Sequence, residues 1–226
     1  MKNNIKHIWL IALFIAMTPH IFAAESSDKY ESEVETRVFV AVKKSFLNKS
    51  LNVEFSPEAR FGGSSFDYDK TLLKFAVDYD IFNWFNVGVG YRATFNKTKK
   101  RGTETTGRLD FDLSKSIKAG KFRIKPRVRF SDYQEYKNTK DIESSYMRYK
   151  VGIGYKYGKK AIFEPEIGAE MFHNLSSGYI SSMRYNIGGD FRITKNNFIG
   201  INYMVETEFK TRILKHIAEV GYTYKF

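Results

Sequence analysis

Four cations alternate with apolar residues along one short stretch, FRIKPRVRF at 122–130. They are Arg123, Lys125, Arg127 and Arg129. Period-two alternation predicts a strand with one apolar and one polar face, so the four charges share a face. Cations repeated in this way would repel one another unless carboxylates face them, or unless they line a pore for anions.

Two other stretches contain acidic side chains at the same spacing, GRLDFDLS at 107–114 and FEPEIGAEM at 163–171. A two-residue turn at Lys118–Ala119 predicts Asp112 opposite Lys125, Asp110 opposite Arg127, and Ser114 opposite Arg123. The same register leaves Arg108 opposite Arg129. On the next hairpin, Arg148, Lys150 and Lys156 should meet Glu164, Glu166 and Glu170. The sequence therefore predicts a network of ion pairs across neighbouring strands.

The only candidate for nucleophilic catalysis is FHNLSSG at 172–178, which contains His173, Asn174, Ser176 and Ser177. Cooperating residues on a strand share a face and lie an even number of positions apart, whereas His173 and Ser176 are three apart. We interpret the segment as a polar loop and assign no catalytic residue. His216 is expected to be isolated on the apolar face. We find no metal-ligand, phosphate-loop or nucleotide motif, expect no cofactor, and do not expect nucleic acid as a partner.

The elements that position these side chains are strands. We count eleven alternating runs: 34–46, 51–61, 71–82, 85–97, 106–117, 121–133, 145–157, 161–172, 181–194, 198–209 and 213–226. Most have the length needed to cross a bilayer at a tilt, about 9–11 residues. Tight turns such as KAGK alternate with longer polar segments such as NKTKKRGTETT and SDYQEYKNTKDIES, as in an outer-membrane barrel. A soluble barrel with an apolar core is the alternative.

We predict an all-β fold, a transmembrane antiparallel up-and-down barrel of 10–12 strands, with twelve favoured. Bacterial single-chain barrels have an even number of strands, so a further strand at 27–33 is expected. Pro126 and Pro165 fall within strands and are expected to cause bulges. The polar face then lines the lumen, where bases, including Arg37, Arg60, Arg92 and Arg184, nearly equal acids in number. Glycines on that face are best explained as room for long neighbouring side chains.

The N-terminus resembles a secretory signal peptide, with Lys2 and Lys6 before the uncharged run IWLIALFIAM. We therefore divide the chain into a signal peptide at 1–24, cleaved after Ala23 or Ala24, and a barrel domain at 25–226. The sequence contains no cysteine, which excludes disulfides and a lipoprotein anchor. The formal net charge is +12. We expect a protein of the Gram-negative outer membrane.

The chain ends in HIAEVGYTYKF, with Tyr222, Tyr224 and Phe226 at alternating positions. This ending resembles the signal by which the barrel-assembly machinery recognises outer-membrane barrels. Four expected strands resemble a family of small Gram-negative outer-membrane barrels classed as a domain of unknown function. They are the Arg148–Tyr155 strand, the strand with Glu170, Phe172 and Asn174, the strand beginning at Arg184, and the closing strand with His216, Ile217, Tyr224 and Phe226. The resemblance covers roughly 35–226 and implies the fold. Small acidic-oligosaccharide channels are similar to a lesser degree.

We expect a narrow, passive, porin-like channel and no enzyme activity. The alternatives are a non-conducting structural or accessory barrel and, more distantly, a lipid-modifying hydrolase. The expected partners are outer-membrane lipid and lipopolysaccharide. The phosphates of lipopolysaccharide would contact the basic cluster Lys97, Lys99, Lys100 and Arg101.

Overall fold

The structure is a computed structural model that describes residues 30–63, 67–81, 85–98, 102–137, 145–156 and 162–226. The predicted signal peptide lies outside the described residues. In the described part of the chain, no helix has the length and apolarity needed to cross a bilayer.

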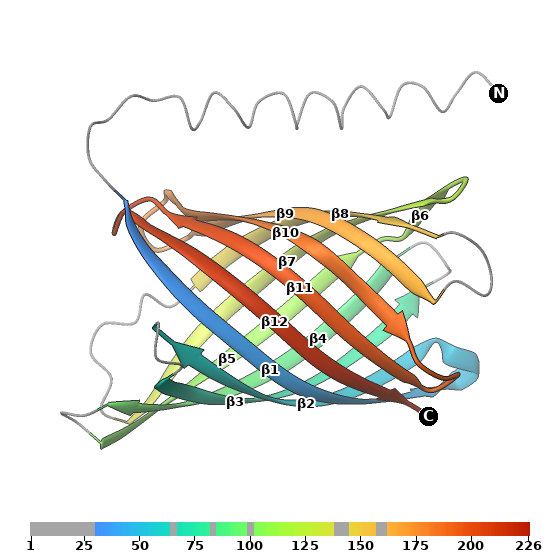
Figure 1. Cartoon of the computed structure of the whole chain (residues 1–226), viewed down its shortest axis with the longest axis horizontal. Helices are drawn as coiled ribbons and strands as arrows, with labels where there is room; N and C mark the ends of the chain where they lie inside the picture. The colour runs from blue at the N-terminus through green and yellow to red at the C-terminus, as the bar shows by residue number, and fades with distance from the viewer. Residues whose placement is uncertain (1–29, 64–66, 82–84, 99–101, 138–144, 157–161) are drawn as a thin grey trace. The chain divides into compact units, whose positions relative to one another are not determined.

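The alternating runs form strands at nearly the predicted positions. The strands are β1 (Glu31–Phe46), β2 (Leu51–Gly62), β3 (Asp67–Ile81), β4 (Phe85–Thr98), β5 (Gly102–Ser114), β6 (Ile117–Ala119), β7 (Phe122–Lys137), β8 (Ser145–Tyr155), β9 (Phe163–Asn174), β10 (Ile180–Arg192), β11 (Asn197–Glu208) and β12 (Ile213–Lys225). A single 3-10 turn, Leu47–Lys49, joins β1 to β2. Each strand of the ring pairs with its neighbours in sequence, and Figure 1 shows them tilted around the barrel axis.

The barrel closes at two places. β5 pairs with β7, so that the short β6 only prolongs the line of β5 along the same neighbour. β1 pairs with β12, and these two strands run parallel, from Glu31 opposite Ile213 to Lys43 opposite Lys225. The fold is thus an all-β barrel of twelve strands, as predicted, in which eleven form the closed ring and the twelfth is β6.

Three details differ from the sequence expectations. Residues 31–33 extend β1 and form no separate strand, and the even-number rule fails because the parallel β1–β12 pairing closes an odd ring. Pro126 causes no bulge, because β5 breaks off opposite it and β6 resumes at Ile117; the Lys115 N–H donates to the Pro126 carbonyl at 3.1 Å. Pro165 lies opposite Gly189 in regular register, just where the β8 pairing ends.

The expected difference in loop length is also smaller than predicted. β4 continues through Thr98 and β7 through Lys137, so much of NKTKKRGTETT and SDYQEYKNTKDIES belongs to strands. Alternation persists through these segments because polar residues such as threonine are acceptable on both faces near a barrel rim. The expectation of long loops rested on polarity, which does not distinguish a rim strand from a loop.

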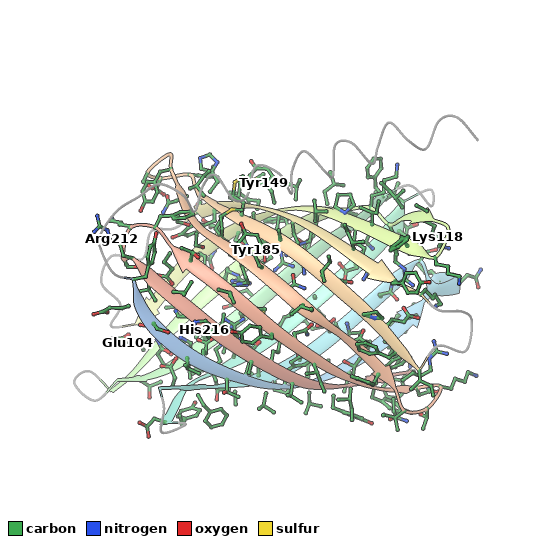
Figure 2. The ribbon with its side chains drawn as sticks, turned by 45° about the horizontal axis from the view of Figure 1, so that its top comes forward. Glu104, Lys118, Tyr149, Tyr185, Arg212 and His216 are labelled. Atoms are coloured by element: carbon green, nitrogen blue, oxygen red, sulfur yellow. The ribbon has the colours of Figure 1, made fainter. Side chains whose placement is uncertain are left out.

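The two faces of the sheet have opposite character. Outward residues are apolar and exposed, such as Ile187, 60% exposed, and Phe75, 50% exposed. Inward residues are charged and covered, such as Asp110, 4% exposed, and Glu170, 5% exposed. Figure 2 shows Tyr149, Tyr185 and His216 on the outer surface of the strands. A soluble barrel would have the reverse arrangement, so the fold has the pattern of a barrel built for lipid.

Candidate lumenal charge network

Three of the four β7 cations reach across a strand. Arg123 Nη2 lies 3.2 Å from Glu164 Oε2, Lys125 Nζ 2.5 Å from Glu166 Oε2, and Arg127 Nη2 2.7 Å from Glu170 Oε1. Their partners are on β9, and β8 lies between. Next-nearest strands are separated by roughly 10 Å, a distance that long side chains lying across the lumen can span. The expected partners on β5 were wrong for these three cations.

Glycines make this crossing possible. Gly154 and Gly152 of β8 lie directly opposite Arg123 and Lys125, so no side chain stands under the crossing cations. A Cβ atom added to Gly152 would lie 3.0 Å from Glu166 Oε1. The expectation that lumenal glycines make room for long neighbouring side chains agrees with this geometry.

Arg129 instead binds the acids of β5. Its Nε and Nη2 donate to the two oxygens of Asp112, both at 2.7 Å, and its Nη1 donates to Asp110 Oδ2 at 3.1 Å. Asp110 also accepts from Arg108 Nη2 at 2.9 Å and from Ser131 Oγ at 2.6 Å. A two-pronged arginine–carboxylate contact fixes orientation as well as charge. These five residues form a compact cluster whose members are buried or nearly so.

The predicted β5–β7 register is wrong by four residues. Asp112 pairs with Arg129 and Ser114 with Arg127, while Arg108 lies opposite Tyr133 and not Arg129. The turn lies at Gly120–Lys121, two residues beyond the predicted turn, and Gly120 has a φ of 63°. Glycine adopts this backbone conformation at no steric cost and is favoured in two-residue hairpins. An even shift keeps every side chain on its predicted face.

Glu170 is the centre of the second half of the network. Its Oε1 lies 3.0 Å from Arg148 Nη2 in addition to the Arg127 contact, and its Oε2 lies 3.8 Å from Arg184 Nη1. Lys156 Nζ lies 2.9 Å from Glu164 Oε1. Lys150 faces Glu170 in the β8–β9 register but forms no ion pair within 4.0 Å among the described residues. A single carboxylate therefore binds arginines from three strands.

Four further arginines, Arg37, Arg60, Arg92 and Arg184, lie in the described interior on strands that the predicted site did not include. Arg37 and Arg60 contact Glu35, at 2.5 and 3.6 Å, and Arg60 also contacts Glu58 at 2.6 Å. Arg184 contacts Glu206 at 2.5 Å. The alternation of polar and apolar residues was the only basis for assigning these residues to the lumen. Their grouping with Arg108 and Arg148 depends on how far neighbouring strands are staggered around the barrel, which the sequence does not contain.

Open space remains between the charged side chains. One cavity of about 990 Å³ is lined by residues of β1 to β5 and β7 to β12, including Arg37, Arg92, Arg127 and Arg148. A second, of about 800 Å³, lies toward the end where β5 and β6 meet and includes Asp80, Asn86 and Lys118. The two cavities share Arg123, Lys125, Arg127, Lys150 and Glu166. Among the described residues, no group of histidines, cysteines and carboxylates is arranged to hold a metal ion.

The His–Ser segment is divided between the two faces of the barrel. His173 lies on the outward face at the end of β9, while Ser176 and Ser177 are exposed in the following turn. The Ser177 N–H donates to the Asn174 side chain at 3.0 Å. The prediction that His216 is isolated was wrong, because its Nδ1 lies 2.7 Å from the Tyr203 hydroxyl on the outer face.

The C-terminal aromatics lie together at one rim. The rings of Tyr224 and Phe226 meet edge to face at 4.7 Å, and the Tyr222 hydroxyl donates to Asn197 Oδ1. Phe226 is 64% exposed, and its N–H donates to the Lys43 carbonyl at 2.9 Å. Of the basic cluster, Lys97 belongs to β4, and Lys99, Lys100 and Arg101 lie outside the described residues.

A closed barrel with an apolar exterior and a charged, ion-paired interior has the fold of the outer-membrane β-barrel class. The chain belongs to the family described as protein of unknown function (DUF2490), whose model matches residues 36–213. Among solved structures, the chain is similar to the outer membrane phospholipase A from Escherichia coli, with 16% identity, 79% of this chain and 72% of that chain covered, and a TM-score of 0.42. No curated protein matches the chain.

Proposed function

We propose that the protein is a narrow, passive channel of the outer membrane. The observation that carries this proposal is the polar cavity of about 990 Å³ inside a barrel whose outer face is apolar. Barrels of about eight strands are filled by side chains and those of about sixteen are open. An eleven-strand ring lies between these limits, so the size and pairing of lumenal side chains decide what passes.

Conductance should be low because ion-paired side chains occupy part of the lumen. Arg127 and Arg129 both connect β7 to other strands, and Glu170 and Asp110 receive several arginines each. These groups are covered by neighbours, so they are held more tightly than surface pairs and are less screened by salt. Water and small ions would pass around them, and large solutes would not.

A second candidate function is a non-conducting structural or accessory barrel. The observation favouring it is the crowding at Asp110, Arg129, Arg148 and Glu170, each less than 9% exposed. If these side chains block the lumen at all times, the interior serves only stability.

Planar-bilayer recordings on the refolded barrel distinguish the two. A channel should give stepwise conductance that rises when Arg127 and Glu170 are both replaced by alanine, since this pair lies over β8 inside the lumen. The matched control replaces the exposed outward pair Tyr203 and His216 by alanine and should leave conductance unchanged. Absence of steps in the parent and in the widened variant would support the non-conducting barrel.

A further inference from the structure

One half-buried arginine of the described lumen has no hydrogen-bond or ion-pair partner. Among the lumenal arginines that the structure describes, Arg92 of β4 forms no hydrogen bond or ion pair, and its Nε is covered. Buried charges in proteins are paired, and an unpaired buried donor normally has an ion or water bound to it. Arg92 is therefore the place in the lumen where a ligand could complete the hydrogen bonding.

The acids near Arg92 are already engaged. Glu58 and Asp110 attract it electrostatically. However, Glu58 accepts from Arg60 Nε at 2.6 Å, and Asp110 accepts from Arg108, Arg129 and Ser131. In register, Arg92 lies between Lys74 on β3 and Arg108 on β5, both cations. The protein thus places a cation on each strand beside Arg92 and gives its guanidinium no ion pair of its own among the described residues.

Arg92 is one of six arginines that form a ring around the lumen, on β1, β2, β4, β5, β8 and β10. Each member interacts electrostatically with the next around the barrel. The ring consists of Arg37, Arg60, Arg92, Arg108, Arg148 and Arg184. Arg127 and Arg129 join it through shared acids. These eight arginines have six carboxylate partners, Glu35, Glu58, Asp110, Asp112, Glu170 and Glu206, which leaves an excess of two positive charges.

The large cavity opens onto this excess. Arg92 lines it together with Thr94, Asn96 and Thr106, which supply neutral polar groups beside the charge. Asn96 Oδ1 is also covered and lacks a partner. Because the two ends of an amide are interchangeable by a flip, Asn96 can equally present its NH₂ as a donor. A guanidinium flanked by hydroxyl and amide groups matches an oxygen anion rather than a cation or an apolar solute.

We propose that Arg92 is the anchor of an oxyanion-binding site in the lumen, which takes the carboxylate or phosphate group of a small solute. The role of this site in permeation rests on the proposed channel function. In a channel, anionic solutes would bind at Arg92 on the way through a lumen that is otherwise ion-paired. Binding itself does not require conduction, and so it can be measured separately.

Binding is tested by calorimetric titration of the refolded barrel in detergent micelles, in a low-salt buffer. The probes are inorganic phosphate, glucuronate as a carboxylate, and glucose as a neutral control. We expect phosphate, glucuronate or both to bind with one site per chain, and glucose not to bind. Tighter binding of one of the two anions identifies whether phosphate or carboxylate is preferred. No binding of either anion would overturn the proposal.

Two substitutions place the site. Arg92→Gln removes the charge and should weaken anion binding by about tenfold or more, the loss typical of a charged hydrogen bond. Arg92→Lys keeps the charge without the two-pronged geometry and should fall between this variant and the parent. The matched control, Arg123→Gln, removes a paired lumenal cation outside the ring and should bind as the parent does. Parent-like binding by Arg92→Gln would exclude this site.

Bilayer recordings separate this proposal from the channel proposal. In a conducting barrel, millimolar phosphate or glucuronate should reduce the current of the parent and not that of Arg92→Gln. A barrel that binds anions in micelles but shows no conductance would disprove the channel and retain the site. A barrel that conducts but binds neither anion would retain the channel and disprove the site. Heat-modifiable gel migration checks that each variant is folded.

Discussion

Arg127 on β7 and Glu170 on β9 are joined at 2.7 Å across the strand that separates them. Such contacts between next-nearest strands give the barrel cross-links that the backbone ladder does not provide. They also determine which substitutions in the lumen should be costly, because Arg123 and Lys125 cross β8 directly over Gly154 and Gly152.

Replacing Gly152 by valine should destabilise the barrel. A Cβ atom at this position would lie 3.0 Å from Glu166 Oε1, and a branched side chain would push apart Glu166 and Lys125. Overpacking of this kind typically costs about 1–3 kcal/mol. Urea unfolding in lipid vesicles measures the change. Ile153→Val, on the outward face of the same strand, is the control and should change stability by less than the Gly152 variant.

Replacing Asp110 and Asp112 by asparagine should raise anion preference. The change leaves Arg129 and Arg108 without their carboxylates, so the lumen gains positive potential. Reversal potentials in a salt gradient should shift toward the chloride potential. Asp69→Asn, which removes a partly exposed acid near the start of β3, serves as control. An unchanged reversal potential in the double variant would show that these acids do not influence the permeating ions.

Replacing Ile187 by lysine tests whether the outer face meets lipid. Ile187 is 60% exposed in mid-strand, so the change would be harmless in a water-soluble barrel. In a bilayer, a lysine near the midplane costs about 2–4 kcal/mol. Unfolding in vesicles should show this loss. Leu175→Lys, in the turn after β9, should not. Equal stability of the two variants would contradict a lipid-facing surface.

Replacing Phe226 by alanine should lower the amount of assembled barrel in cells while leaving the folded protein nearly as stable. The ring is largely exposed, and the backbone bond from Phe226 to Lys43 does not depend on the side chain. Quantifying heat-modifiable protein in outer membranes measures assembly, and refolding in vitro measures stability. Phe226→Tyr keeps an aromatic ring and should assemble normally. Normal assembly of the alanine variant would refute the role of this residue as an assembly signal.

Replacing Lys97, Lys99, Lys100 and Arg101 by glutamine should reduce the lipopolysaccharide that co-purifies with the barrel. Four cations in five residues, at the end of β4 and in the segment that follows it, suit phosphate groups at a membrane surface. The control replaces Lys118 and Lys121 at the opposite rim, where Figure 2 places Lys118. Equal co-purification in both variants would reject the contact.

The sequence predicted which residues form strands and which face each residue occupies, because alternation encodes both. The sequence prediction failed where the contacts depend on the position of a turn or on pairs that skip a strand. The turn at Gly120 shifted the partners of Asp110 and Asp112, although glycine at that position was a usable signal. Contacts such as Lys125 with Glu166 skip a strand and follow from barrel closure rather than from adjacent pairing. The unpaired state of Arg92 depends on all its neighbours together and has no local signature.

The parallel pairing of β1 with β12 has a consequence for the order of folding. The other strand pairs of the ring join segments that are close in the chain, whereas this pairing, the seam of the barrel, brings together residues such as Val34 and His216 from opposite ends of the chain. Loop closure over so many residues is slow, so the seam should form last. Until then the nascent sheet has two unpaired edges with an apolar face, a species prone to join another copy edge to edge. A chaperone that covers β1 and β12 during transit would prevent this.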